Sequence, residues 1–334
     1  MTVQEKAYRS VISRLGVSML VLFGLITVYR TVALEYLPQI LSFMPQVVGR
    51  IVYELALALV YALTFLAPVF IFYGISKNKP HEPFDAKLYL PRGTLLYLFA
   101  ALGIVAAAAH LNTYIVNIFD AISLIRSEPT ASTQSVPRAS YEILLAFIST
   151  AVVPAFVEEA LFRGTVLKNL LPFGRTTAVF VSALLFGMMH QTATQFFYAT
   201  VAGLVIGYIY VYTKSIWCAV LIHFCNNALS VLLSILYERL PIERAVLVEG
   251  IYYLAILALG IIAALVLMRM HRENGDALLL EGAFERDVPP DAEYAETPLP
   301  MARRVKVFFT PPMIIFVALC AVQVLYMLLY AVLY

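Results

Sequence analysis

Two adjacent carboxylates and an arginine lie in an otherwise apolar stretch of this chain, residues 140–190, which contains Glu158, Glu159 and Arg163. Ionisable side chains in such segments usually mark a functional site. On a helix Glu159 and Arg163 are four positions apart and can pair, whereas Glu158 points about 100° away. We expect the arginine to neutralise one carboxylate while the other faces a cavity. The alternative is an ion-pair network that only locks helices together, which stability alone explains poorly because apolar replacements are often neutral.

A histidine at the end of the next apolar run is the second polar feature. If this run and the preceding one form a hairpin that turns near Gly174, Glu158 and His190 lie almost equally far from the turn. At about 1.5 Å per residue, both side chains then reach nearly the same depth. Phe186 precedes His190 by four residues and shares its helix face, where we expect it to form a wall of the site.

A third feature, His223 and Asn227, lies four positions apart on a later apolar segment. The alternative is a purely structural role, in which these side chains only form hydrogen bonds between helices. Combined with the other residues, the set suits hydrolysis of an amide bond. Glu158 could act as a base on water, while His223 and Asn227 could donate hydrogen bonds to the developing oxyanion. His190 could orient the water or the carboxylate. No serine or cysteine lies in a recognisable nucleophile motif, so activated water is the expected nucleophile.

The composition identifies the elements that must position these residues as membrane helices. The 334 residues are 62% hydrophobic and 13% charged, with a mean hydropathy of +0.85, whereas soluble domains are about 25% charged. The apolar segments reach the ~20 residues that a helix needs to cross a bilayer. The predicted fold is an all-α, polytopic transmembrane helical bundle of about eight to nine spans. The candidate spans are roughly 15–37, 47–75, 94–119, 140–171, 175–191, 194–213, 215–237, 246–269 and 312–334.

Three parts are predicted along the chain. Residues 1–139 are predicted to form N-terminal transmembrane helices, 140–237 the catalytic core, and 238–334 C-terminal helices with a flexible acidic loop at 271–304. Most of the 23 lysines and arginines fall inside if the N-terminus is cytoplasmic, which the positive-inside rule favours. The net charge of +2 does not favour a nucleic-acid partner, and the three cysteines all fall in apolar spans, so no disulfide framework is expected.

The order of the three motifs resembles a known family. Glu-Glu-x-x-x-Arg at 158–163, Phe-x-x-x-His at 186–190 and His-x-x-x-Asn at 223–227 are similar to motifs of the CAAX-processing and bacteriocin-processing intramembrane endopeptidases. This CPBP or Abi family includes the Ras-converting protease. The resemblance covers about 140–237 and implies a helical core around a water-filled site. It implies the following catalytic and supporting residues: Glu158 as general base, His190 assisting it, His223 and Asn227 as oxyanion stabilisers, and Glu159 and Arg163 in support.

Two other classes of function are compatible with these residues. A zinc protease would use Glu158, His190 and His223 as ligands, although no His-Glu-x-x-His pair is present. A non-enzymatic membrane scaffold, immunity factor or transporter could use the same helices. The favoured hypothesis requires no cofactor and takes a peptide or membrane-protein substrate in the lipid bilayer. We expect the protein to reside in a bacterial cell membrane.

Overall fold

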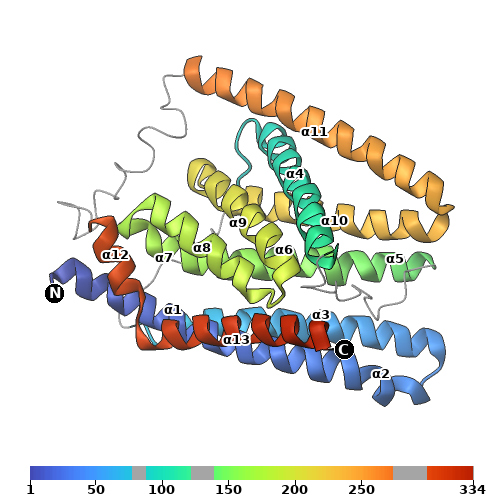
Figure 1. The fold of residues 1–334 in the computed structure, drawn as a ribbon, viewed down its shortest axis with the longest axis horizontal. Helices are drawn as coiled ribbons and strands as arrows, with labels where there is room; N and C mark the ends of the chain where they lie inside the picture. Colours follow the sequence, from blue (N-terminus) through green and yellow to red (C-terminus); the bar gives the residue numbers. More distant parts are fainter. Residues whose placement is uncertain (77–87, 122–138, 274–298, 334) are drawn as a thin grey trace.

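The computed structural model describes residues 1–76, 88–121, 139–273 and 299–333, and these residues form helices and connecting turns without a strand. The long helices lie side by side or cross at an angle, as Figure 1 shows. Their bounds are α1 Val3–Val28, α3 Gln46–Gly74, α4 Thr94–Ala121, α8 Arg175–Met189, α9 Ala193–Thr213, α10 Ile216–Arg239, α11 Ile242–Glu273 and α13 Pro311–Leu333.

Shorter elements complete the described chain. Those after α1 and before α3 are η1 Tyr29–Tyr36, α2 Leu37–Ile40 and η2 Leu41–Phe43, and α12 Met301–Phe308 precedes α13. The helix that carries the carboxylates is built from α5 Ser140–Ala146, η3 Phe147–Val152, α6 Val153–Glu159, η4 Ala160–Leu167, α7 Lys168–Leu170 and η5 Leu171–Phe173.

Within the described residues, seven helices are long and apolar enough to cross a membrane, and the bent pair α12–α13 makes an eighth if it counts as one span. The chain is therefore an integral, multi-pass membrane protein with an all-α bundle. The expected span at 175–191 is the exception, because α8 has only 15 residues. At about 1.5 Å per residue it covers roughly 22 Å, less than the hydrocarbon thickness of a bilayer. The polar residues His190, Gln191 and Thr192 follow α8 and separate it from α9, so this apolar run is short in the sequence as well.

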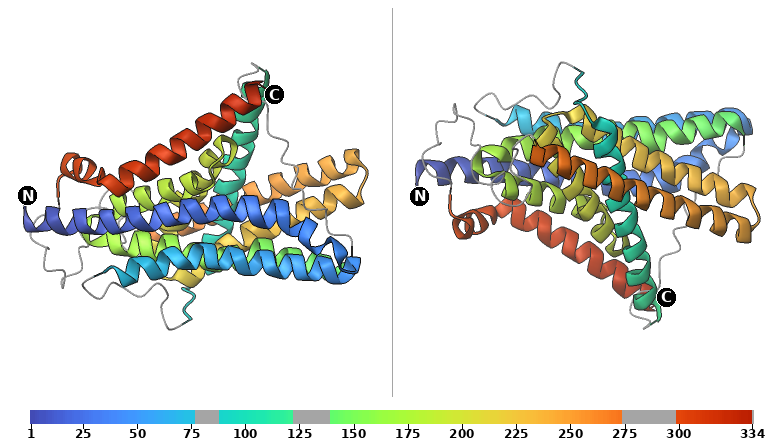
Figure 2. Two further views of the ribbon diagram at one scale, coloured as in Figure 1. Left: turned by 90° about the horizontal axis from the view of Figure 1, so that it is seen from below. Right: turned by 90° about the horizontal axis from the view of Figure 1, so that it is seen from above.

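The helix 140–173 lies in the middle of the bundle and contacts helices from both halves of the chain (Figures 1 and 2). Helices α3 and α10 both pack against α6, and α8 packs against η4. On one side α1 packs along α3 and α13, and on the other α4 crosses α11 and α9. The α4–α11 crossing is close, because a Cβ on Gly103 would lie 2.8 Å from the Cα of Gly260. Small residues commonly permit such backbone approach between membrane helices.

Two wide, π-helical turns flank the carboxylates. The first, η3, ends directly before Val153-Pro154, and the second, η4, begins directly after Glu159. Proline cannot donate a backbone hydrogen bond to the carbonyl four residues earlier, which here is that of Thr150. Single π-helical turns are frequent at functional sites. The chain then reverses at Gly174, whose φ of 130° favours glycine, and forms the predicted hairpin with α8.

The acidic segment predicted as a loop at 271–304 is described only at its ends, because residues 274–298 lie outside the described residues. Its last part is helical and belongs to α12, which bends by 76° into α13. Arg303 of α12 pairs with Glu5 at 3.1 Å, and Arg304 donates to the Thr177 hydroxyl at 2.7 Å. These contacts hold α12 against the beginnings of α1 and α8.

Candidate active site

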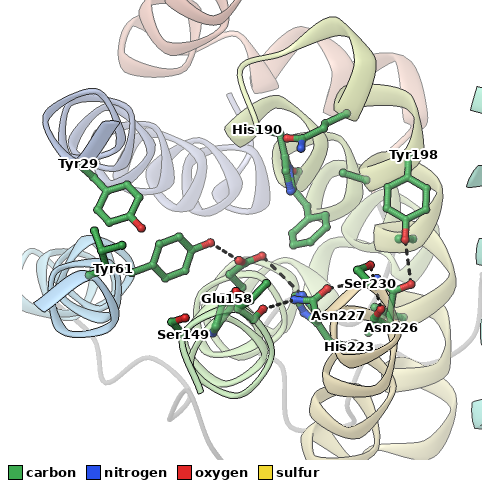
Figure 3. A pocket seen from close by; sticks show the side chains of 18 residues that line it. Tyr29, Tyr61, Ser149, Glu158, His190, Tyr198, His223, Asn226, Asn227 and Ser230 are labelled. Carbon is green, nitrogen blue, oxygen red and sulfur yellow. Dashed lines mark hydrogen bonds and ion pairs between the residues drawn. The ribbon is translucent and has the colours of Figure 1, made fainter. Parts of the chain in front are cut away.

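One cavity of about 390 Å³ collects the polar residues singled out by the sequence. Glu158 from α6, His190 from the end of α8, and His223 and Asn227 from α10 all line it (Figure 3). Phe186 lines it as well, whereas Glu159 and Arg163 lie behind the wall with no exposed side-chain area. The further lining residues are Tyr29, Leu57, Tyr61, Ser149, Thr150, Pro154, Gln195, Tyr198, Ala199, Ala202, Ile206, Asn226 and Ser230.

Glu158 reaches the cavity between two partners. One carboxylate oxygen, Oε1, accepts a hydrogen bond from the Tyr61 hydroxyl of α3. The other, Oε2, lies 3.9 Å from Nε2 of His223. That separation exceeds a hydrogen-bond distance, so Nε2 keeps its capacity for a further acceptor. Only 4% of Glu158 is exposed. The side chain is thus almost wholly buried, yet both oxygens are directed to groups at the cavity.

Glu159 serves a different purpose from its neighbour. Its Oε1 accepts hydrogen bonds from Nη1 of Arg163 at 2.9 Å and from Nδ1 of His223 at 2.7 Å. The predicted pairing of Glu159 with Arg163 is therefore confirmed. Nη2 of Arg163 donates to the Gly203 carbonyl of α9 at 3.1 Å. Because a carboxylate accepts, Nδ1 of His223 must carry the proton in this bond. The two acidic and two basic side chains carry balanced formal charges when His223 is protonated, as a buried cluster requires.

The ring of Phe186 packs against both histidines of the cavity. Its ring centroid lies 5.3 Å from that of His190 and 5.9 Å from that of His223, both edge to face. The Arg163 guanidinium stacks 5.0 Å from the same ring on a third side. Nδ1 of His190 lies 3.0 Å from the Phe186 carbonyl oxygen, and a carbonyl can only accept. Nδ1 of His190 is therefore the donor, which leaves Nε2 of the neutral ring as an acceptor.

The asparagines of α10 form a second hydrogen-bonded group at the cavity. Nδ2 of Asn227 donates to the Thr150 carbonyl at 3.2 Å, which is the oxygen that Pro154 cannot satisfy. The Asn227 carbonyl accepts from Nδ2 of Asn226 at 3.3 Å, and Asn226 in turn accepts from Tyr198 at 2.8 Å. An amide nitrogen has two hydrogens, so Asn227 can still donate one to a ligand.

Several residues that line the cavity were not predicted from the sequence. Tyr61, Tyr29 and Tyr198 come from three different helices, and Asn226 had no predicted part in the site. A tyrosine on an apolar helix gives no charge signal, since it is common both in cores and near membrane interfaces. Asn226 adjoins Asn227 in the sequence, and its role as a hydrogen-bond bridge depends on Tyr198 of α9.

The residues of the zinc alternative, Glu158, His190 and His223, all line the cavity, and the choice between zinc and no metal stays a prediction. Across the part of the chain that the structure describes, no group of three or more His, Cys, Asp or Glu side chains is placed to hold a metal ion. The hydrogen bonds at Nδ1 of His190 and of His223 leave Nε2 of each ring available, which is also the usual arrangement of a zinc-bound histidine.

Comparison with known proteins supplies an independent assignment for this segment. Residues 140–229 match the family described as type II CAAX prenyl endopeptidase Rce1-like. The searches of curated proteins and of solved structures gave no match. The matched residues include all three motifs and every polar residue from 140 onward that lines the cavity, except Ser230. Residues 140–229 are therefore similar to the family of type II CAAX prenyl endopeptidases over the segment that holds these motifs.

Proposed function

We propose that the protein is an intramembrane glutamic endopeptidase in which Glu158 activates water. The observation that carries this proposal is the meeting of Glu158 and His223 across one cavity, with 3.9 Å between Oε2 and Nε2. A hydrogen bond holds each side chain in place: Tyr61 donates to Glu158, and Glu159 accepts from His223. Such prior orientation lowers the cost of reaching the transition state.

The first step is attack of water on the carbonyl carbon of the scissile amide. Glu158 takes one proton from the water while the water oxygen forms the new C–O bond. His190 offers Nε2 as an acceptor at the same cavity and so helps to orient the water. Phe186 fixes the position of that ring.

The second step is collapse of the tetrahedral intermediate. The oxyanion receives hydrogen bonds from Nε2–H of His223 and from the remaining amide hydrogen of Asn227, and preorganised donors of this kind usually supply the largest stabilisation. Protonated Glu158 then gives its proton to the leaving nitrogen as the C–N bond breaks. The products are a carboxylic acid and an amine, which become a carboxylate and an ammonium ion by transfer of one proton, and Glu158 is ionised again.

The substrate is a peptide segment that reaches the membrane-embedded cavity. The name of the matched family points to the C-terminal tail of a prenylated protein, and a leader peptide or another membrane protein would present the same amide bond. The cavity combines apolar walls, such as Leu57 and Ile206, with polar groups at one side. This combination suits an extended peptide whose apolar side chains face hydrocarbon.

The test is cleavage of a peptide library by the purified protein in proteoliposomes, in water enriched in ¹⁸O. The library includes prenylated C-terminal peptides and unprenylated leader peptides. Mass spectrometry is expected to show an internal cut with one ¹⁸O in the new carboxylate, at a rate unaffected by chelator. Loss of cleavage with chelator, restored by zinc, would favour the zinc protease. Absence of cleavage for every peptide class, in protein that unfolds cooperatively, would favour a scaffold.

A further inference from the structure

A second cavity, outside the active site, lies between the beginning of α1 and the end of α3. It has a volume of about 700 Å³. Its polar lining is basic and hydroxylic, with Ile75 as its apolar edge. The lining residues on α1 are Met1, Lys6, Arg9, Ser10, Ser13 and Arg14. We call these residues, together with Ile75, the basic groove.

The helix period brings the cations of the basic groove together. Lys6, Arg9, Ser13 and Arg14 follow spacings of three, four and one along α1, so they share one face and its edge. Lys6 and Arg9 are exposed, while Arg14 is half-buried. The three long cationic side chains all extend from α1 to the cavity, and the hydroxyl-bearing residues Ser10 and Ser13 line it as well.

Among the described residues, no carboxylate neutralises these cations. Nε of Arg14 donates to the Ser10 carbonyl at 3.2 Å, and its guanidinium lies 5.6 Å from the centroid of Phe72. Neither of its Nη groups has a hydrogen-bond partner within the described residues. The nearby acid, Glu5, is bonded to Arg303 at 3.1 Å and to the Thr2 amide at 3.0 Å. The groove therefore presents two guanidinium groups, an ammonium group and two hydroxyls to a ligand.

The position of the basic groove along α1 indicates the source of its ligand. The apolar part of α1 begins at Leu15, so Arg14 marks the level at which hydrocarbon gives way to headgroups. We propose that the basic groove binds a phosphate group, and that anionic phospholipid is its source. Guanidinium and ammonium groups with hydroxyls match phosphate oxygens, and basic clusters at a membrane surface attract anionic lipid. A soluble phosphate has the same chemistry, but anionic headgroups are concentrated at this level of a membrane.

Native mass spectrometry of the full chain, titrated with phosphatidylglycerol or phosphatidylcholine, tests this proposal. The groove variant carries Lys6→Gln, Arg9→Gln and Arg14→Gln. The matched control variant carries Arg92→Gln, Lys214→Gln and Arg272→Gln, which removes three exposed cations at other helix ends. We expect the groove variant to lose phosphatidylglycerol affinity by about tenfold or more, while the control stays within about twofold of wild type.

Three outcomes would overturn the assignment. Equal losses in both variants would show a general effect of charge, and equal binding of the two lipids by wild type would show no selection for an anion. Displacement of phosphatidylglycerol by millimolar inorganic phosphate would assign the groove to a soluble phosphate instead of a lipid. Thermal unfolding of both variants identifies a loss of affinity that comes from misfolding. If the triple groove variant is misfolded, the single Lys6→Gln variant, which changes an exposed residue, is titrated against wild type. A lower affinity of this variant for phosphatidylglycerol then supports the proposal, and an unchanged affinity overturns it.

Discussion

The imidazole of His223 is fixed by Glu159 and not by Glu158, because Nδ1 of His223 lies 2.7 Å from Oε1 of Glu159. The same oxygen binds Arg163 at 2.9 Å. Two carboxylates that adjoin in the sequence therefore have separate tasks. Glu159 anchors the cationic side chains behind the cavity wall, and this leaves Glu158 to face the cavity.

Replacing Arg163 with methionine is expected to destabilise the protein by about 3–5 kcal/mol, because a buried carboxylate loses its cation. Both partners have no exposed side-chain area. Replacing Glu159 with leucine in the same chain should recover most of the lost stability, since no charge is then left alone. It should not recover activity, because His223 has lost its acceptor. Chemical or thermal unfolding in detergent measures the stability of both variants. A double variant no more stable than Arg163→Met would contradict the pairing of Glu159 with Arg163.

Replacing Tyr61 with phenylalanine is expected to lower kcat by about tenfold or more, the value of a hydrogen bond to a charged group. Tyr29→Phe is the matched control. It lines the same cavity, its ring lies 5.4 Å from that of Tyr61, and its hydroxyl has no hydrogen bond to a described residue. Steady-state kinetics should show a fall in kcat for Tyr61→Phe alone, with KM nearly unchanged. Equal effects of the two variants would mean that the Tyr61 hydroxyl does not position Glu158.

The two adjacent asparagines allow a test of the oxyanion donor. Asn227→Ala is expected to lower kcat by about 10²-fold, as the loss of one such donor does in other hydrolases. Asn226→Ala removes only a bridge between Tyr198 and Asn227 and should cost clearly less. If Asn226→Ala were the more damaging variant, the roles given to the two amides would have to be exchanged.

Phe186→Ala is expected to cost about 3–5 kcal/mol of stability, because a buried aromatic ring leaves a void. Activity should fall further than stability alone explains, since both histidines rest on this ring. The control is Phe180→Ala on the same helix, whose side chain is half exposed. Unfolding and cleavage are measured on both variants. A Phe186→Ala protein with wild-type kinetics would show that the histidines keep their positions without the ring.

The sequence predicted those parts of the site that depend on helix period. The Glu159–Arg163 pair, the hairpin at Gly174 and the shared face of His223 and Asn227 all follow from spacings of three to four residues and from a glycine turn. Charged and amide side chains in apolar helices are rare enough to be noticed singly. These features can therefore be identified from residue type and spacing alone, and the cavity brings them together.

Other parts depend on tertiary packing that no local pattern encodes. Tyr61 meets Glu158 from 97 positions away in the sequence, and its residue type does not distinguish it from other tyrosines on apolar helices. The π-helical turns of η3 and η4 also have no clear sequence signal beyond Pro154. The predicted orientation, with a cytoplasmic N-terminus, stays a prediction.

The most direct measurement of the central claim compares two buried carboxylates. Glu54 of α3 is as buried as Glu158, with 4% exposed, but it is bonded to Arg50 and to Ser149 at 3.0 and 3.2 Å. For peptide cleavage in proteoliposomes, Glu158→Gln should lower kcat by about 10³-fold or more, and Glu54→Gln by less than about tenfold. A Glu158→Gln protein that cleaves at the rate of Glu54→Gln would contradict the role of Glu158 as the base.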